Sequence, residues 1–403
     1  MKPADAAPAP TAIEEAPVAN PGVAFAGLFA VTFCGLLAIG AVLPVLPRYV
    51  HGPIGAGDLA VGIVIGAYAV SGLLLRPFAG RFADTRGRKP TMIFGALLVA
   101  VGGFLYLPPL GVAGLVVARL VLGVGEGTVF TAGSAWIVDI APVQRRARVI
   151  GLYGLAVWSA LSVGPLLGEL IQHAAGYTAV WLFSAAMPLV GAAIATRLPD
   201  PYRPTAHPER QPLIAREAIR PGAALAMGAF GYAAVATFVV LHLDERGIGH
   251  GAAVFGAFAT TIVLTRLLAG DLPDRVGPAR VAIAAALVEA CGLVAIAFAQ
   301  CLPLALAGAM AMGTAVSLLY PSLSLIVVNR VPDARRGAAL GTFTAFFDAG
   351  VGIGAPLAGL AAALTTYEGA FLMASVVAVA AAVAVATAVA PHSREVVAAR
   401  AGG

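Results

Sequence analysis

Long apolar runs follow one another along most of the chain, and short polar segments separate them. Each run has about 20 residues or more, which is enough for one helix to cross the hydrocarbon core of a bilayer. The pattern predicts twelve membrane helices. Their approximate bounds are 23–47, 59–82, 90–108, 112–138, 147–171, 177–197, 221–243, 251–272, 279–299, 302–329, 337–364 and 368–390.

The composition agrees with this pattern. Hydrophobic residues make up 60% and charged residues 11% of the 403 residues, and the mean hydropathy is +0.92. Average soluble domains carry about 25% charged residues, so this chain has too few charges to cover a water-soluble surface. We expect a multi-pass protein of a bacterial-type inner (plasma) membrane, with the lipid bilayer as its surroundings.

The positions of lysine and arginine predict the orientation. With the N-terminus in the cytoplasm, only Arg48 and Arg246 fall in outward loops, Arg76, Arg119 and Arg266 fall within helices, and the other 20 of the 25 basic residues face the cytoplasm. Basic residues prefer cytoplasmic loops, so both termini are predicted to be cytoplasmic. The pI of about 9.3 then reflects topology, and we expect no nucleic-acid partner.

Composition divides the chain into five parts. Residues 1–22 are rich in Ala and Pro and predict a disordered cytoplasmic tail. A polar, proline-containing stretch at 198–220 predicts a cytoplasmic linker between two sets of six helices, at 23–197 and 221–390. Residues 391–403 form a second cytoplasmic tail.

Motifs for enzyme or metal chemistry are missing from the sequence. The three cysteines lie in apolar runs without CxxC spacing, and the histidines never occur as HxxxH. Ser/His/Asp, HExxH and paired-carboxylate constellations are not visible. The absence of a Walker A sequence argues against ATP as the energy source. We expect no metal, no other cofactor and no enzymatic activity.

An internal repeat relates the two sets of helices. Nine residues recur at a constant offset of 190, and most are Gly, Pro, Arg or Asp beside loops. Such duplication of membrane bundles is a transporter signature. The first copies are Arg76, Gly80, Asp84, Gly87, Pro142, Arg145, Arg146, Gly151 and Gly164, and the second copies are Arg266, Gly270, Asp274, Gly277, Pro332, Arg335, Arg336, Gly341 and Gly354.

The polar loop after the second predicted helix carries the most specific motif, Gly80-Arg-Phe-Ala-Asp84-Thr-Arg86-Gly87-Arg88-Lys89. Its glycines permit a tight turn and close approach of helices, and its carboxylate can accept hydrogen bonds from basic groups. A degraded copy follows the eighth helix, as Gly270-Asp-Leu-Pro-Asp274-Arg275-Val-Gly277. The motif resembles the signature loop of the major facilitator superfamily.

This resemblance implies an all-α membrane protein with the major facilitator fold, in which twelve transmembrane helices form two pseudo-symmetric six-helix bundles. It also implies secondary active transport of a small-molecule substrate by alternating access, with protons as the expected coupling ion and a monomer as the working unit. In the family this loop latches the cytoplasmic side. We assign to this inner gate Gly80, Asp84, Arg86, Gly87, Arg88, Lys89, Asp139, Arg145 and Asp274. The alternative is a loop that serves only as a positive-inside topology signal.

Two charged residues lie inside the fourth predicted helix. Arg119 begins a run that resembles the family's motif of a buried arginine followed by glycines, and Glu126 stands where the family usually has a small residue. Seven residues are close to two turns, so both side chains share one face about 10.5 Å apart along the axis. In the family this helix lines the central cavity. We expect Glu126 to be the proton-coupling or substrate-contacting acid and Arg119 its electrostatic partner, with a static interhelical ion pair as the alternative.

Two further acids lie within predicted helices. Asp348, in the eleventh, has no basic residue within a turn on its own helix, so it is either neutral or satisfied from another helix. Proton relay and structural hydrogen bonding remain equal alternatives for it. Glu289 lies in the ninth helix, which is peripheral in the family's fold, and we expect it to make an interhelical contact.

The fifth predicted helix resembles the glycine-and-proline motif of the drug:proton antiporter branch. Its members are Gly151, Gly164, Pro165 and Gly168, and Ala160 stands where another glycine is usual. Small residues at this spacing allow a neighbouring helix to come close. The motif favours export over import, and generic close packing is the alternative.

Few other residues on the helices expected to line the cavity carry aromatic or hydroxyl groups. Candidates for the lining are Phe33, Tyr232, Phe238, Ser317 and Tyr320. A mostly apolar wall with one buried charged pair suits a small amphipathic organic compound, either a drug or a metabolite. The sequence therefore predicts proton-coupled efflux by antiport. The alternatives are a proton-coupled importer and a membrane sensor or assembly factor that transports nothing.

Overall fold

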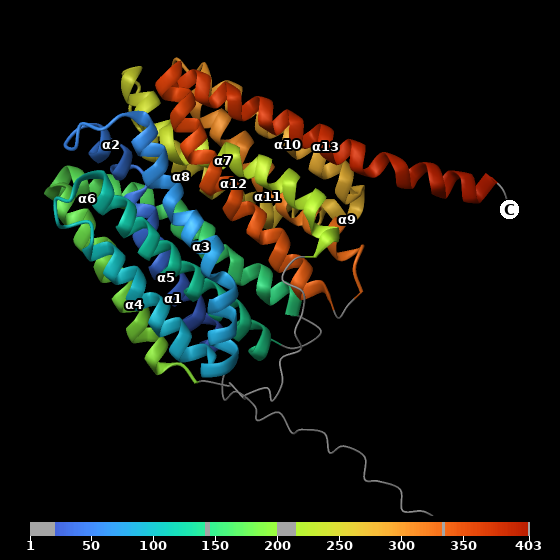
Figure 1. Ribbon diagram of the computed structural model, residues 1–403, viewed down its shortest axis with the longest axis horizontal. Helices are drawn as coiled ribbons and strands as arrows, with labels where there is room; N and C mark the ends of the chain where they lie inside the picture. The colour runs from blue at the N-terminus through green and yellow to red at the C-terminus, as the bar shows by residue number, and fades with distance from the viewer. Residues whose placement is uncertain (1–20, 142–145, 200–214, 333–334, 402–403) are drawn as a thin grey trace, which may run out of the picture.

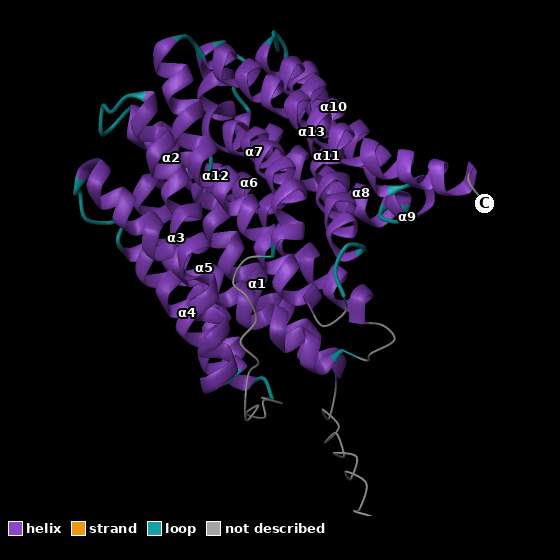
Figure 2. Cartoon of the chain, turned by 45° about the vertical axis from the view of Figure 1, so that its right-hand side comes forward, coloured by secondary structure: helices purple, strands orange, loops and turns teal. Residues whose placement is uncertain are grey.

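The computed structural model describes residues 21–141, 146–199, 215–332 and 335–401 (Figure 1). In these ranges the chain is helical and contains no strand (Figure 2). Most of the predicted N-terminal tail and of the predicted linker lies outside them, as does Arg145.

Thirteen α-helices and one short 3₁₀ helix make up the described part. They are α1 (Pro21–Val42), α2 (Val45–His51), α3 (Asp58–Arg86), α4 (Arg88–Phe104), α5 (Gly111–Ile140), α6 (Arg146–Arg197), η2 (Arg216–Ala218), α7 (Ile219–Glu245), α8 (Gly251–Ala269), α9 (Leu272–Val276), α10 (Pro278–Ala297), α11 (Leu302–Val328), α12 (Arg336–Leu364) and α13 (Tyr367–Ala401).

Ten helices of the described part are long and apolar enough to cross a membrane. One of them, α6, holds two crossings because the backbone of Gly176 leaves the helical region at φ 78°. Gly168 packs on Ala41 near one end of α1 and Leu198 contacts Gly27 near the other, so the chain turns back at this break. The 17-residue α4 is the remaining crossing. The predicted all-α fold with twelve crossings is therefore confirmed.

The internal repeat is visible in the backbone. Gly87, between α3 and α4, has φ 105°, and Gly277, between α9 and α10, has φ 104°. Residues with a side chain rarely adopt this conformation, so each copy of the loop needs glycine at its turn.

Prolines shorten two predicted helices. The first was expected to run to residue 47, but α1 ends at Val42 and the chain resumes as α2 after Pro44. Similarly, α8 ends at Ala269, and Pro273 starts the short α9. Proline lacks the amide hydrogen that continues a helix, which explains both interruptions.

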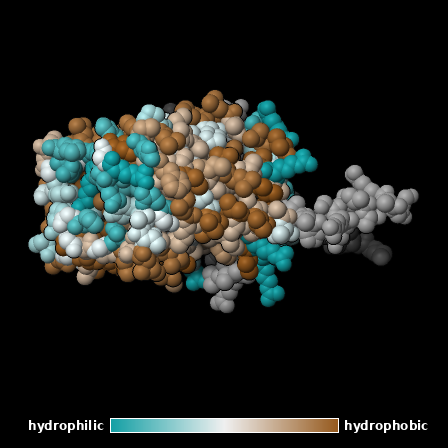
Figure 3. Space-filling view, turned by 90° about the horizontal axis from the view of Figure 1, so that it is seen from above, coloured by the Kyte–Doolittle hydropathy of each residue, from teal (hydrophilic) through white to brown (hydrophobic). Residues whose placement is uncertain are grey.

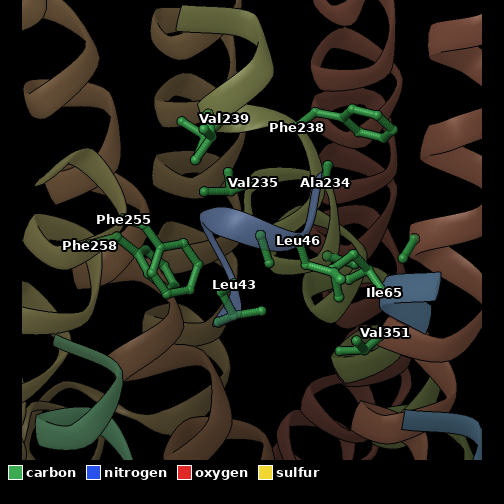
Figure 4. Close-up of a cluster of buried hydrophobic side chains, with 14 of the residues drawn as sticks. Leu43, Leu46, Ile65, Ala234, Val235, Phe238, Val239, Phe255, Phe258 and Val351 are labelled. Carbon is green, nitrogen blue, oxygen red and sulfur yellow. The ribbon is translucent and has the colours of Figure 1, made fainter. Parts of the chain in front are cut away.

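The two bundles share a core at one end and have separate cores at the other. Buried residues of α1, α2 and α3 pack with those of α7, α8 and α12 in one large cluster, part of which is drawn in Figure 4. We call this the Arg48 end, after the arginine on α2. At the opposite end, named the Gly87 end, one cluster contains only residues of the first bundle and another only residues of the second. The bundles are thus closed against each other at the Arg48 end.

The flanks of the molecule are apolar. Large hydrophobic side chains that are more than half exposed include Leu74, Phe78, Leu268, Leu364 and Val376. In the view of Figure 3, hydrophobic residues cover much of the surface and hydrophilic ones gather towards its ends. This distribution suits a protein surrounded by lipid.

Candidate functional site

An ion pair joins the two bundles within the membrane region. Arg76 on α3 places Nε 2.8 Å from Oδ2 of Asp348 on α12, and its Nη2 donates to Oδ1 at 3.2 Å. Asp348 is only 7% exposed. The Arg76 guanidinium also lies 5.7 Å from the ring centre of Phe130 on α5. Asp348 is therefore satisfied from another helix, one of the two possibilities that its sequence context left open.

Glu126 on α5 lies on the first-bundle side of this pair. Its carboxyl interacts with the hydroxyl of Tyr68 on α3 and is within electrostatic reach of Arg76 and Asp348. The side chain is half-buried. Two carboxyl groups, one from each bundle, thus share the field of a single arginine.

Arg119 does not pair with Glu126 in this structure. Its Nε and Nη2 donate to the backbone carbonyls of Val64 and Ile65 on α3, at 3.3 and 3.2 Å, and its guanidinium lies 5.0 Å from the ring centre of Tyr68. Helical side chains lean toward the N-terminus of their helix. Arg119 therefore reaches away from Glu126, which lies two turns towards the C-terminus, and the expected direct partnership is replaced by one with α3.

Two tyrosines of the second bundle complete the group. The hydroxyl of Tyr320 on α11 shares a hydrogen bond of 2.8 Å with Thr344, and the residue is within electrostatic reach of Arg76, Arg266 and Asp348. Tyr232 on α7 is similarly close to Arg119 and Glu126. We call these side chains the central polar cluster, which comprises Tyr68, Arg76, Arg119, Glu126, Tyr232, Arg266, Tyr320 and Asp348.

The other candidates for the lining lie elsewhere. Phe238 is fully buried at the Arg48 end, where its ring stacks on Tyr367 at 5.5 Å. Ser317 is 1% exposed and donates to the carbonyl of Ile262, which ties α11 to α8. Phe33 stacks on Phe29 of its own helix at 6.4 Å. Phe238 and Ser317 are thus packed between helices in this conformation, because helix membership does not define which face a residue occupies.

Polar contacts at the Arg48 end were missed by the sequence analysis. Arg48 on α2 forms a bidentate ion pair with Asp244 on α7, in which Nε and Nη2 donate to the two carboxylate oxygens at 2.6 and 2.9 Å. Its Nη1 also pairs with Glu169 on α6 at 3.0 Å. Tyr367 donates to Asp58 across the same boundary at 3.0 Å. The available signal was that only Arg48 and Arg246 fell in outward loops. Because few basic residues lie on that side, each was a candidate for an ion pair with a carboxylate.

The expected inner-gate residues lie at the Gly87 end. Arg88 pairs with Asp84 at 2.5 Å and with Asp139 at 3.0 Å, and Lys89 donates to the carbonyl of Leu198 at 2.9 Å. Arg86 stacks over Phe82, Gly80 lies beside Thr131, and Asp274 is in α9. The ion pairs that join Arg88 to Asp84 and Asp139 lie within the first bundle, and those that join Arg275 to Asp271 and Arg335 to Glu217 lie within the second.

The glycines of α6 differ in their surroundings. A side chain at Gly168 would meet the carbonyl of Ala41 at 1.9 Å, and one at Gly164 would meet the backbone of Gly40 at 2.9 Å. Pro165 lies between them in the same helix. Gly151, in contrast, has nothing within 4 Å of the position a Cβ would take. Close packing of α1 on α6 thus explains two of the three glycines.

Glu289 on α10 is fully buried and both of its carboxyl oxygens lack a hydrogen-bond partner. They face α7, where a side chain at Gly231 would come within 2.3 Å of Oε1. The expected interhelical contact is present, but it is made with bare backbone rather than with a polar partner.

Comparisons with known proteins identify the architecture. The family model of the Major Facilitator Superfamily matches residues 28–272 and 223–402. The chain is 34% identical over 360 residues to an uncharacterised transporter of this type from Salmonella typhimurium, covering 87% of this chain and 92% of the relative. This chain belongs to the major facilitator superfamily. A second uncharacterised major facilitator transporter, from Burkholderia mallei, is 35% identical over 357 residues, covering 86% of this chain and 87% of that one.

Solved major facilitator structures share the fold at low sequence identity. The nucleoside transporter NupG has a TM-score of 0.77 at 15% identity and covers 90% of this chain and 99% of its own. A peptide transporter has a TM-score of 0.77 at 15% identity, covering 94% and 97%. A human organic anion transporter has a TM-score of 0.69 at 17% identity, covering 91% and 99%. The protein is thus a multi-pass secondary transporter of this superfamily.

Proposed function

We propose that this transporter exports a small amphipathic organic compound in exchange for protons, by alternating access, from a cell whose inner membrane it spans with both termini in the cytoplasm. The observation that carries the proposal is the sharing of Arg76 between two carboxyl groups, Asp348 of the second bundle and Glu126 of the first.

Coupling follows from the position of this arginine. While Asp348 is ionised, its pair with Arg76 holds α3 against α12. A proton on Asp348 removes the attraction, so Arg76 can turn to Glu126 and the bundles can rock. Charges that are kept away from bulk water interact strongly, so one proton is enough to change the balance between two arrangements.

The difference between the two ends of the molecule supports an inward-facing conformation. The Arg48 end is closed by an apolar cluster and by the Arg48–Asp244 ion pair between bundles, whereas the Gly87 end has separate cores. With the Gly87 end in the cytoplasm, a compound would enter from the cytoplasm and leave after the Arg48 end opens. The antiporter-like glycines of α6 support export.

Proteoliposomes with an imposed pH gradient test the proposal. Accumulation of organic compounds against their gradient, lost in Glu126→Gln and Asp348→Asn, supports it, and unaltered pH-driven flux in both variants contradicts it. Flux in the opposite direction in oriented vesicles would support the importer. A sensor or assembly factor predicts no flux, and a phenotype that survives neutralisation of Arg119 and Glu126.

A further inference from the structure

The two halves of the repeat differ in the charged residues that surround their equivalent arginines. Arg266 on α8 is the counterpart of Arg76 on α3, and each faces a helix of the opposite bundle. Asp348 faces Arg76, but the residue 190 positions before Asp348 is Trp158 on α6. The second arginine therefore lacks the carboxylate that its symmetry mate has.

Arg266 forms neither a hydrogen bond nor an ion pair within the part of the chain that the structure describes. One of its guanidinium nitrogens lies 3.8 Å from the position that a Cβ on Gly154 would take, and Tyr320 lies within its electrostatic reach. These neighbours belong to α6 and α11, so the side chain points towards the bundle interface. It is only half-buried, so part of the side chain remains exposed.

The charges of the central polar cluster do not balance. Three arginines, Arg76, Arg119 and Arg266, stand against two carboxyl groups, Glu126 and Asp348. Arginine stays charged under all ordinary conditions, and an uncompensated charge in the membrane region is normally retained for a function. One negative charge would complete the cluster. Arg119 is 2% exposed and bonded to backbone carbonyls of α3, whereas Arg266 is half-buried, so we assign the missing charge to Arg266.

Aromatic rings extend from this position along the same interface. Trp158 lies 6.1 Å from both Tyr232 and Phe258, and Tyr232 lies 5.9 Å from Phe347. Phe258 and Arg266 are eight residues apart on α8, a separation of about 12 Å along the helix. That spacing fits a compound with an anionic group at one end and a flat apolar body at the other.

We propose that Arg266 binds the anionic group of the transported compound, so that the substrates are monoanions with an aromatic or cyclic body. This inference names the substrate class of the proposed transport site and rests on that function. The planar guanidinium would hold a carboxylate through two parallel hydrogen bonds, while Trp158 and Tyr232 contact the ring system.

Equilibrium binding to the purified transporter tests the inference without any gradient. The probes are 2-naphthoate, its neutral amide and the cationic 2-naphthylmethylamine. The wild type is expected to bind the carboxylate roughly tenfold to a hundredfold more tightly than the amide, and the cation least. Arg266→Gln should abolish this preference, and Arg266→Lys should retain part of it. Arg275→Gln, a matched loss of charge at an exposed position, should leave it intact.

A second variant recreates the missing symmetry. Trp158→Asp introduces a carboxylate at the position that the repeat relates to Asp348. It should abolish anion binding in a protein that still folds. Equal binding of naphthoate and naphthamide by the wild type would overturn the inference, as would an unchanged preference in Arg266→Gln. Either result leaves proton-driven transport of other compounds possible, whereas absence of all pH-driven flux would overturn the proposed function instead.

Discussion

Asp348 on α12 and Arg76 on α3 form an ion pair between two helices that belong to different bundles, 272 residues apart in the chain. The repeat relates this pair to Trp158 and Arg266, which has no carboxylate. The approximate two-fold symmetry of the fold is thus broken at the position where the bundles meet, and we assign coupling to the first of these pairs and substrate binding to the second.

Neutralising the acid of this pair should uncouple transport. In Asp348→Asn the pH-driven accumulation of substrate should fall at least roughly tenfold, a loss of about 1.4 kcal/mol of coupling. Exchange of labelled for unlabelled substrate without a pH gradient should persist, because binding remains. Flux measurements in proteoliposomes distinguish pH-driven accumulation from exchange. Asp271→Asn, at an exposed position, is the control and should behave like the wild type, and equal loss of exchange in Asp348→Asn would argue for a purely structural pair.

Weakening the Arg48 end should expose its apolar cluster. The Arg48–Asp244 pair is partly exposed and worth about 1 kcal/mol, so Asp244→Asn should raise the population open at this end about fivefold. Leu46→Cys, in a background without the three native cysteines, reports the opening because Leu46 is fully buried. Its labelling by a membrane-impermeant thiol reagent should accelerate accordingly. Glu245→Gln, next to Asp244 but outside the pair, should not change the rate.

The helices and the repeat could be predicted from the sequence because both follow from local patterns. Apolar runs of bilayer length specify crossings, and the recurrence of Gly87 at Gly277 predicted two loops that indeed share one backbone conformation. The partners of charged side chains could not be predicted in this way. Spacing along one helix suggested that Arg119 faces Glu126, but the arginine leans toward its helix N-terminus and bonds to α3. The Arg76–Asp348 pair joins distant segments, and no rule of local spacing links them.

The glycines of α6 should differ in their tolerance of a methyl group. Gly168→Ala forces a methyl against the backbone of Ala41 and should lower the free energy of unfolding by about 1–3 kcal/mol. Gly151→Ala meets nothing and should be neutral or stabilise the helix by up to about 1 kcal/mol. Thermal unfolding in detergent measures both. Equal effects would show that α1 does not pack on α6 as described.

Glu289 should be replaceable without loss of stability. Its two carboxyl oxygens are buried without partners, and a buried polar group without a hydrogen bond costs about 1–3 kcal/mol. Glu289→Met, of similar length and apolar, should unfold at an equal or higher temperature than the wild type. Glu245→Met, at an exposed position, is the matched control and should change little. A marked destabilisation of Glu289→Met would mean that the carboxyl has a partner essential to folding.

The central claim is that the charge state of the Arg76–Asp348 pair controls which end of the transporter is open. Distances between spin labels at positions 51 and 250, and between labels at 85 and 275, measured by pulsed electron paramagnetic resonance in the wild type and in Asp348→Asn, test it most directly. The account predicts that the variant lengthens the first distance, at the Arg48 end, and shortens the second, at the Gly87 end. Unchanged distances at both ends, or changes in the same direction, would contradict it.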